Sequence, residues 1–323
     1  MKTLEEGLGE LYSPPAPDEF RAWVHKNKEL VMKEKVMDEK TAVATFVKDG
    51  DYIGTELYGT VRAPMSLIRE VIRQGKKELR VAGQGIIEID LLLAADSVKS
   101  LDITYVAYEV YGISHILRRA VESGKVKTTE WSNAALAWRF KAAAMGVPFI
   151  PTRSMLGTDT FRRSAAKIVE CPFTGMKVCL LPALHLDVGF IHCHRADKYG
   201  NCQIDGISGF AIEFARACKR LIVSTEKIIP HDEIRRYPER TIIPYFLVDA
   251  VVEAPYGSHP GEMCYLYWRD EEHLKKFLED SKDEGKTKAY LDKYVYGVKD
   301  HWEYINLIGL ARLKWLESQM TGR

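Results

Sequence analysis

Glu109 is the residue of this sequence whose position most needs a chemical explanation. It follows residues 103–108 in the stretch ITYVAYEVYG, an apolar run that predicts a buried strand ending at the carboxylate. A carboxylate there is costly unless a substrate or a partner group uses it. Desolvated at a ligand site, it could act as a general base or as a nucleophile. Capping of the next helix, or an ion pair with Arg118 or Arg153, would explain the residue equally well.

Two glycine-bearing segments also follow predicted strands. GTELYGTVRAP (residues 54–64) precedes a helix, and helix N-termini favour anions, while Arg62 could hold a carboxylate or phosphate through two parallel hydrogen bonds. The segment fits neither the dinucleotide nor the phosphate-loop pattern, so a plain strand-to-helix turn is the alternative. Gly83 and Gly85 in VAGQG indicate close approach to the backbone, by a ligand or within a tight turn.

Histidine and cysteine lie close together in FIHCHRADKYGNC. Strand alternation places His192 and His194 on one face, and with Cys202 they would offer three zinc ligands. One strand without a second clear ligand pair is weak support, so we predict hydrogen-bonded histidines and no metal. RSMLGTDTFRR (residues 153–163) brings Arg153 and Thr158 into another loop, which is either a polar ligand contact or a surface loop.

Composition narrows the class of protein. The chain has 323 residues, is 46% hydrophobic and carries a formal net charge of +1, which gives no electrostatic reason to expect nucleic acid or a membrane surface as partner. The six cysteines form no CxxC pair and lie mostly in apolar runs, which favours reduced thiols and a cytoplasmic location. The acidic first residues do not resemble a signal peptide, and the apolar runs are too short to span a bilayer.

Strand and helix patterns alternate through most of the chain, which predicts an α/β fold with an open, mostly parallel sheet and helices on both faces. We expect an N-terminal arm and helix over residues 1–37, with the helix at 18–36, and an α/β domain over 38–260. A C-terminal helical region, 261–323, is expected to pack on the same domain. Predicted strands include 51–58, 78–83, 100–108, 147–151, 177–184, 187–197, 220–229 and 247–255. Ligands bind at the carboxyl ends of strands in such sheets.

Long segments give the sequence a family resemblance. Residues 40–315 resemble the α (A) subunit of class I coenzyme A transferases, most closely the glutaconate CoA-transferase type. The likeness lies in AAAMGVPFIPTR, LDVGFIHCHRADKYGN, VDAVVEAPYGSHPGEMCYLY and YGVKDHWEYINLIGLARL, among others.

The resemblance implies a CoA-transferase/NagB-like fold and a heteromer with a β subunit, without nucleic acid or membrane. In such enzymes a glutamate attacks the acyl-CoA, forms an anhydride and then a glutamyl-CoA thioester, and an acceptor carboxylate takes the CoA. In the glutaconate type this glutamate is on the β subunit. Coenzyme A is thus a substrate, and no tightly bound cofactor or metal is expected. The pocket of the family makes Arg62, Ser66, Arg153, Thr158, Glu56, Gly83, Gly85 and His192 candidate substrate contacts.

Two departures from the glutaconate pattern leave the branch of the family open. Many relatives have a Gly-Gly-Phe motif where this sequence reads GTELYG, with Thr55 and Glu56. The segment YVAYEVYGISHILRRAVESGK is similar to the α subunit of steroid-ring-opening CoA hydrolases, whose catalytic glutamate maps onto Glu109. The alternatives are therefore a ring-opening hydrolase or a decarboxylase that uses Glu109, and thirdly a non-enzymatic acyl-CoA-binding protein.

Overall fold

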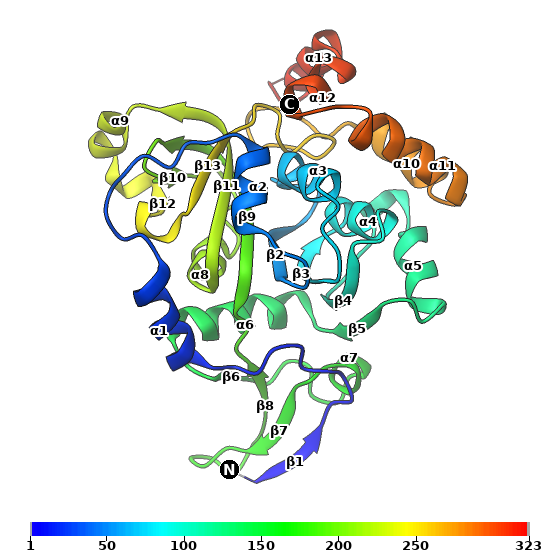
Figure 1. The fold of residues 1–323 in the computed structure, drawn as a ribbon. Coiled ribbons are helices and arrows are strands. Elements are labelled where there is room, and N and C mark those ends of the chain that lie inside the picture. The colour runs from blue at the N-terminus through cyan, green and yellow to red at the C-terminus, as the bar shows by residue number, and fades with distance from the viewer. Residues whose placement is uncertain (1, 322–323) are drawn as a thin grey trace.

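The computed structural model describes residues 2–321 and consists of a large α/β body with a small antiparallel sheet at one end (Figure 1). The strands are β1 (Thr3–Glu6), β2 (Tyr52–Gly59), β3 (Leu79–Gly85), β4 (Val98–Ile103), β5 (Lys127–Glu130), β6 (Phe149–Thr152), β7 (Lys167–Glu170), β8 (Lys177–Pro182), β9 (Leu186–Asp197), β10 (Cys202–Gln203), β11 (Cys218–Ile229), β12 (Thr241–Ile243) and β13 (Ala250–Glu253).

The α-helices are α1 (Pro17–Asn27), α2 (Glu39–Phe46), α3 (Met65–Arg73), α4 (Ile87–Ala94), α5 (His115–Glu122), α6 (Asn133–Met145), α7 (Asp159–Arg163), α8 (Ala211–Arg216), α9 (His231–Arg236), α10 (Glu271–Asp280), α11 (Glu284–Leu291), α12 (His301–Ile308) and α13 (Leu310–Thr321). Short 3₁₀ turns are η1 (Glu109–Tyr111), η2 (Pro238–Arg240) and η3 (Tyr245–Leu247), and a π-helical turn, η4 (Asp292–Tyr296), follows α11. No helix of residues 2–321 has the length and apolar character needed to cross a bilayer.

The central sheet confirms the predicted mostly parallel architecture. Parallel pairing joins β13, β11, β9, β2, β3, β4 and β5 in that order, and β10 and β12 add to β9 as antiparallel strands. Gly54 lies opposite Gly189, so β2 and β9 approach where neither backbone carries a side chain. All the parallel strands therefore end at one edge, where the loops after them meet.

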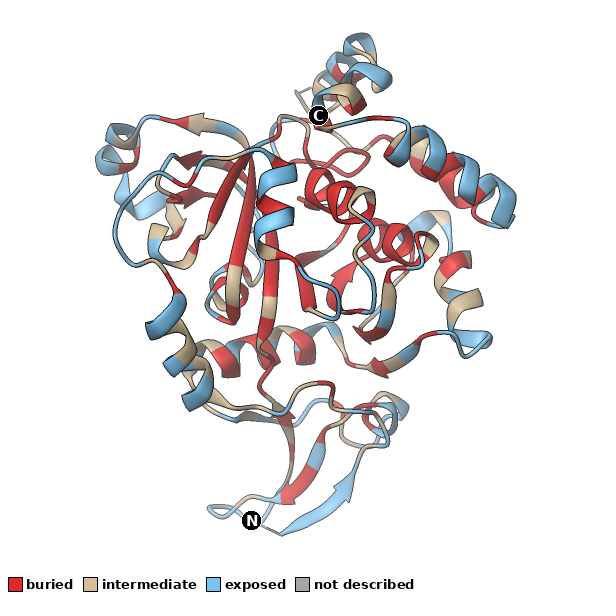
Figure 2. Cartoon of the chain, in the orientation of Figure 1, coloured by how far each residue is buried: buried red, intermediate tan, exposed pale blue. Residues whose placement is uncertain are grey.

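Helices cover both faces of this sheet, as expected. On one face, α3, α4, α10 and α11 enclose a core that includes Ile68, Leu92 and Phe277. On the other, α6 and α8 pack over a second core that includes Phe140 and Phe214. Figure 2 shows that the central strands and helices α3 and α4 are largely buried, whereas α10 and α11 have exposed outer faces. The C-terminal helices lie at the opposite end of the molecule from the small sheet (Figure 1).

Two of the predicted elements end earlier in the structure than expected. The strand predicted at 100–108 ends at Ile103, whose carbonyl accepts the Trp131 N–H as the last sheet-like contact. The helix predicted at 18–36 ends at Asn27, because Lys28 and Lys35 reach inward to Asp249 and to the carbonyls of 245 and 248. The segment after α1 is therefore extended and runs alongside β13.

The strands predicted at 147–151 and 177–184 form part of a second sheet, not of the central one. This sheet has the order β1-β7-β8-β6 and is antiparallel throughout. Its buried side, with Ile168 and Leu181, joins the core under α6. Apolar alternation predicted the strands but carried no information about which sheet they would join.

A buried polar cluster fixes the β4–α6 side of the body. Asp102 accepts hydrogen bonds from Tyr52, from Trp131 Nε1 at 2.7 Å and from Arg139 Nη1 at 2.9 Å, and the Asp102–Arg139 pair is 1% exposed on each side. Because a buried charge that loses its partner keeps its full desolvation cost, this cluster should be sensitive to single changes.

We therefore expect Asp102→Asn to destabilise the fold by about 3–5 kcal/mol, the usual effect of breaking a buried pair. Urea denaturation of the two proteins would measure it. Asp96→Asn, which breaks an exposed pair with Lys125, is the control and should change stability by less than about 1 kcal/mol. Equal effects of the two changes would show that the Asp102 cluster contributes no more to stability than an exposed ion pair.

Candidate active site at the carboxyl edge of the sheet

Five loops meet where the parallel strands end: residues 56–62, 85–88, 109–112, 205–210 and 255–267. A Cβ added to Gly59 would lie 3.8 Å from Glu109 Oε1, and one added to Gly209 would lie 2.6 Å from Glu56 Oε1. A Cβ on Gly257 would lie 2.6 Å from His192 Cε1. The edge is thus built by close approach of loop backbone to the side chains of neighbouring loops.

Unusual backbone conformations gather in these loops. Non-glycine residues with positive φ include Leu57, Arg62, Glu109, Tyr256 and Tyr265, all at this edge. Left-handed geometry costs a non-glycine residue about 1–3 kcal/mol and persists only where the surroundings enforce it. Such residues cluster at ligand sites, which makes this edge the candidate active site.

Arg62 and Glu56 form an ion pair inside the first loop. Their side chains are 0% and 1% exposed, and Arg62 Nη2 lies 2.7 Å from Glu56 Oε2. Arg62 also donates to the carbonyl of His192 at 2.9 Å and to that of Ile207 at 3.2 Å. Burial raises the pKa of Glu56, and Arg62 opposes this shift. The predicted substrate contacts of both residues do not fit this geometry, because the pair is consumed in joining loop 56–62 to β9 and to loop 205–210.

Glu109 lies at the same edge as Arg62, but in a different setting from the predicted one. It begins the turn η1 after β4 and is exposed in the isolated chain, with a φ of 50°. Arg118 pairs with Glu122 instead, at 2.8 Å, and no hydrogen bond or ion pair is formed by the Glu109 carboxylate within residues 2–321. The carboxylate is therefore free for a substrate or a second chain, and the predicted burial at a strand end is wrong.

Asp90 fixes the Glu109 turn through hydrogen bonds from residues on both sides of it. Its carboxylate accepts from Tyr108 Oη at 2.8 Å and from Ser114 Oγ at 2.5 Å, and these donors stand on either side of the turn. The Tyr108 N–H also donates to the Gly112 carbonyl at 2.7 Å. Burial raises the pKa of Asp90 to about 6. A buried acid thus fixes the position of an exposed one.

Gly83 and Gly85 are close to protein side chains, which accounts for these glycines without a ligand. A Cβ on Gly85 would lie 2.2 Å from Glu88 Oε1, and one on Gly83 would lie 3.0 Å from Thr55 Oγ1. Burial raises the pKa of Glu88 to about 7. Thr55 Oγ1, Glu56 Oε1 and Glu88 Oε2 are buried here, and each lacks a hydrogen-bond partner within the described chain.

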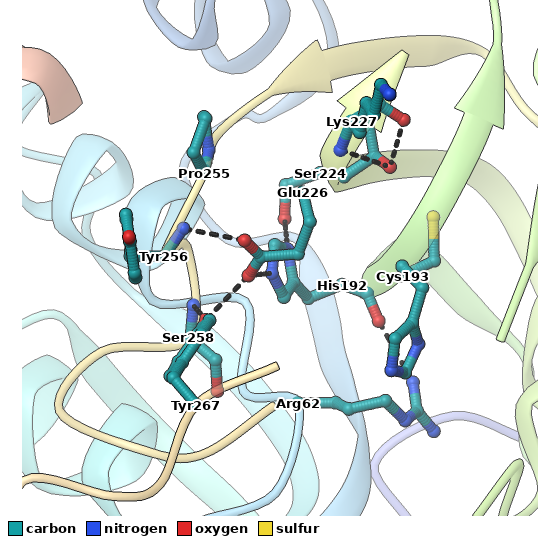
Figure 3. Close-up of polar contacts among 12 residues, drawn as sticks. Arg62, His192, Cys193, Ser224, Glu226, Lys227, Pro255, Tyr256, Ser258 and Tyr267 are labelled. Atoms are coloured by element: carbon teal, nitrogen blue, oxygen red, sulfur yellow. Dashed lines mark hydrogen bonds and ion pairs between the residues drawn. The ribbon is translucent and has the colours of Figure 1, made fainter. Parts of the chain in front are cut away.

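His192 belongs to a network that ties β9 and β11 to loop 255–267 (Figure 3). Its Nδ1 is 2.8 Å from Ser224 Oγ and its Nε2 is 2.8 Å from Glu226 Oε1. Glu226 also accepts from Tyr267 Oη at 2.6 Å and from the Tyr256 N–H at 2.7 Å. Ser224 is fully buried, so this Ser–His–Glu chain cannot present a nucleophile and instead positions the loop.

The zinc arrangement considered for His192, His194 and Cys202 does not fit. Both ring nitrogens of His192 are occupied, as above. His194 Nδ1 accepts the Asp205 N–H at 3.1 Å, and its Nε2 lies 2.8 Å from the Cys264 carbonyl oxygen. Burial lowers the pKa of His194, consistent with a neutral imidazole. The two histidines are structural hydrogen-bonding groups.

The remaining candidates lie apart from Glu109. Ser66 is fully buried at the start of α3, with no partner for its hydroxyl within the described chain. Arg153 is exposed in the loop after β6, and Thr158 caps α7 through the Phe161 N–H at 3.1 Å. Thr160, on the first turn of α7, lines a cavity of about 570 Å³ with Tyr105 and Trp131. Helix α7 therefore lies near the ends of β4 and β5, and no hydrogen bond or ion pair joins Arg153 to Glu109 within residues 2–321.

Asp90 and Glu226 were missed by the sequence analysis. Glu226 interrupts the apolar run RLIVSTEKII in the same way that Glu109 follows its own apolar run. The signal was present and the same reasoning would have found it. Asp90 lies in IIEIDLLL, where helical periodicity places it on the core face, and a buried acid there also needs partners.

Comparison with known proteins identifies the family of the chain. The family model for Coenzyme A transferase matches residues 36–254. The chain is 52% identical over 324 residues to an uncharacterized protein of Archaeoglobus fulgidus, covering 98% of this chain and 72% of that one. It is 35% identical over 298 residues to the α (A) subunit of the glutaconate CoA-transferase of Acidaminococcus fermentans, covering 86% of this chain and 93% of the relative. The cholesterol ring-cleaving hydrolase IpdA subunit of Mycobacterium tuberculosis is 27% identical over 290 residues, 85% of this chain and 99% of that one.

Solved structures give the same result. The crystal structure of the Acidaminococcus fermentans glutaconate coenzyme A-transferase superposes with a TM-score of 0.85 at 33% identity, over 88% of this chain and 95% of that one. The decarboxylase AibA/AibB gives 0.70 at 28% identity, over 80% of this chain and 100% of that one. The chain belongs to the coenzyme A transferase family.

The raised pKa of Glu88 predicts a pH-dependent stability. Folded Glu88 keeps its proton up to about pH 7, whereas in the unfolded chain the carboxyl has its ordinary pKa of 4.5 and releases the proton at lower pH. Stability therefore falls as pH rises from 4.5 to 7, and Glu88→Gln removes this loss. We expect the variant to gain up to about 3 kcal/mol relative to the parent between these limits. Denaturation at pH 5 and pH 8 would measure it, with exposed Glu122→Gln as control. A pH-independent difference would contradict the raised pKa of the buried Glu88 carboxyl.

Proposed function

We propose that this chain is the α (A) subunit of a heteromeric acyl-CoA:carboxylate CoA-transferase of the glutaconate type. The observation that carries the proposal is the agreement with the glutaconate transferase in sequence and in fold over nearly the whole chain. The substrates would be an acyl-CoA and a carboxylic acid, with coenzyme A as the transferred group. No tightly bound cofactor or metal takes part in the proposed reaction. The reaction needs no membrane or nucleic acid, and a cytoplasmic location suits it.

The surface around Glu109 supports the presence of a partner chain at this edge. Val110 is 88% exposed, and Tyr105, Ile113 and Tyr265 are 56%, 52% and 69% exposed. Large apolar side chains beside an exposed carboxylate contribute stability only if another surface covers them and removes them from water. A β subunit placed there would exclude water from Glu109 and close the site.

In this proposal the partner's glutamate carries the CoA. Its carboxylate attacks the thioester carbonyl, CoA leaves as a thiolate, and a mixed anhydride remains. The thiolate then attacks the glutamyl carbonyl of the anhydride and releases the acyl carboxylate, leaving a glutamyl-CoA thioester that the acceptor acid resolves. This chain supplies loops 56–62, 109–112 and 255–267 as one wall of the pocket, with Glu109 facing the reacting groups.

The intermediate can be trapped directly. Incubation of the two-chain complex with acyl-CoA, then borohydride reduction and mass spectrometry, should convert one glutamate of the partner to the alcohol, with no modification of this chain. The same treatment without acyl-CoA is the control. Continued turnover of the thioester without any adduct would exclude the transferase.

A ring-opening or carbon–carbon-cleaving hydrolase is the second candidate, and a decarboxylase belongs with it. The specific observation is Glu109 itself, an exposed carboxylate without a protein partner in the described chain that is held in a left-handed conformation. The hydrolase relatives align over 85% of this chain. In that role Glu109 would act as the base that activates water. A non-enzymatic acyl-CoA-binding protein is a third function, and no feature of the site favours it.

Glu109→Gln separates the two enzymes. If Glu109 is the general base, kcat for acyl-CoA cleavage should fall by about 10²–10⁴-fold, the usual contribution of such a group. If the partner's glutamate carries the CoA, transfer should persist and the borohydride adduct should still form. Glu122→Gln, exposed on the neighbouring helix, is the matched control. An unchanged kcat in Glu109→Gln would end the hydrolase proposal.

A further inference from the structure

A second cavity lies between the C-terminal helices, away from the Glu109 edge. It has a volume of about 590 Å³ and is lined by residues of α10, α11 and η4, together with Arg312 of α13. The opposite face of α10 packs on the Glu109 turn, since Lys275 lies over the Tyr111 ring and Leu278 lies near Gly112. The cavity is thus on the far side of that helix. Its volume is typical of small-molecule sites.

Aromatic rings form the wall of this cavity. The ring centroids of Phe277 and Tyr290 are 4.5 Å apart, those of Tyr290 and Tyr294 are 4.7 Å apart, and His273 lies 4.9 Å from Tyr294. His273 Nε2 is 2.7 Å from Tyr290 Oη, which fixes both rings. Burial lowers the pKa of His273 to about 3, so the imidazole is neutral. Phe277 and Tyr290 are 2% and 8% exposed, so the half-buried ring of Tyr294 is the aromatic surface that this cluster offers to a planar ligand.

The side chains that line the cavity carry a net positive charge. Its acidic groups are already paired: Asp270 with Arg312 at 2.6 Å, and Asp280 with Lys276 at 2.7 Å. Glu272 also lies 3.4 Å from Arg312. Lys286 and Lys293 line the same cavity, and neither has an acidic partner within residues 2–321. Neither ammonium group is in a salt bridge within residues 2–321, and Lys293 Nζ lies 4.7 Å from the Tyr294 ring centroid. Such a pair of cations beside an aromatic ring suits an anion attached to a flat ring.

The backbone at this wall is also irregular. Lys293 and Tyr294 belong to η4, a π-helical turn that continues α11. Such turns are rare and occur often at functional sites. Here the turn places a lysine and a tyrosine on the same cavity.

A metal ion does not suit the site. His259, Asp270 and His273 have ligand atoms close enough together to hold one. However, Arg312 donates two hydrogen bonds to Asp270, at 2.6 and 3.1 Å, and its charge would repel a cation. His259 is also engaged, through Nδ1 with Tyr304 Oη at 2.7 Å. The cluster of His259, Asp270 and His273 therefore has a structural role beneath the cavity.

We propose that this cavity binds an adenine nucleotide, with the base on the Tyr290–Tyr294 wall and the phosphate at Lys286 and Lys293. The nucleotide is either a free one or the nucleotide end of coenzyme A. Binding at this place does not depend on the proposed transferase reaction. Contacts from Asp270 to the Pro260 carbonyl and from Glu262 to Thr60 join the cavity floor to the first loop of the active site.

The experiment is calorimetric titration of the two-chain complex with AMP, ADP, 3′-phosphoadenosine 5′-phosphate and CoA. We expect saturable binding of at least one of them, weakened about tenfold by Lys286→Ala or Lys293→Ala, since each removes one charge-assisted contact. Both lysines are exposed, so the variants should fold. Lys282→Ala, on the same helical hairpin but paired with Glu279, is the matched control and should bind as the parent does.

Competition identifies the source of the nucleotide. If the CoA end binds here, 3′-phosphoadenosine 5′-phosphate should compete with acyl-CoA, and Lys293→Ala should raise KM with kcat unchanged. If a free nucleotide binds here, AMP or ADP should bind without competing with acyl-CoA. The absence of saturable binding of all four compounds at millimolar concentration, or binding that neither lysine variant weakens, would overturn the proposal. A complex that binds nucleotide but lacks transferase activity would contradict only the proposed function.

Discussion

The buried ion pair between Glu56 and Arg62 is the constraint on which the candidate active site depends. It joins Glu56 of β2 to Arg62 in the loop that follows, and Arg62 also binds the His192 carbonyl of β9 and the Ile207 carbonyl of loop 205–210. A charge pair removed from water is favourable only with good geometry and additional hydrogen bonds. Here Arg62 makes the additional bonds, whereas Glu56 Oε1 is buried without a hydrogen-bond partner in the described chain. The pair therefore fixes the left-handed turn at Arg62, and with it the position of Gly59 beside Glu109.

The same principle recurs around the site. Asp90 holds the Glu109 turn, and Glu226 holds loop 255–267 through three donors. Both acids are buried or nearly buried, so neither carboxylate is accessible to a substrate. Glu109 differs because its carboxylate is exposed and the apolar side chains beside it are also exposed. In the proposed function, the chain supplies one half of the site and a second polypeptide supplies the other half.

The sequence was sufficient for the architecture and for the edge where the site lies. Alternating strands and helices predicted the parallel sheet, and the rule for carboxyl ends brought Glu109 and loop 56–62 together. The direction in which side chains point was not predictable. Arg62 was expected to meet a substrate anion, yet Glu56, six residues earlier, satisfies it within the loop. Gly83 and Gly85 were correctly marked as positions of close approach, but the approaching groups are Thr55 and Glu88. Periodicity likewise could not assign β6 and β8 to a separate sheet, because antiparallel pairing depends on distant partners.

The central claim is that Glu109 and its apolar surroundings are covered by a second polypeptide. Carbodiimide labelling of carboxylates, read by mass spectrometry, tests it most directly. Glu109 should be labelled in the isolated chain and protected in the two-chain complex, while Glu284, exposed on α11, should be labelled equally in both. Equal labelling of Glu109 with and without the partner would contradict the account.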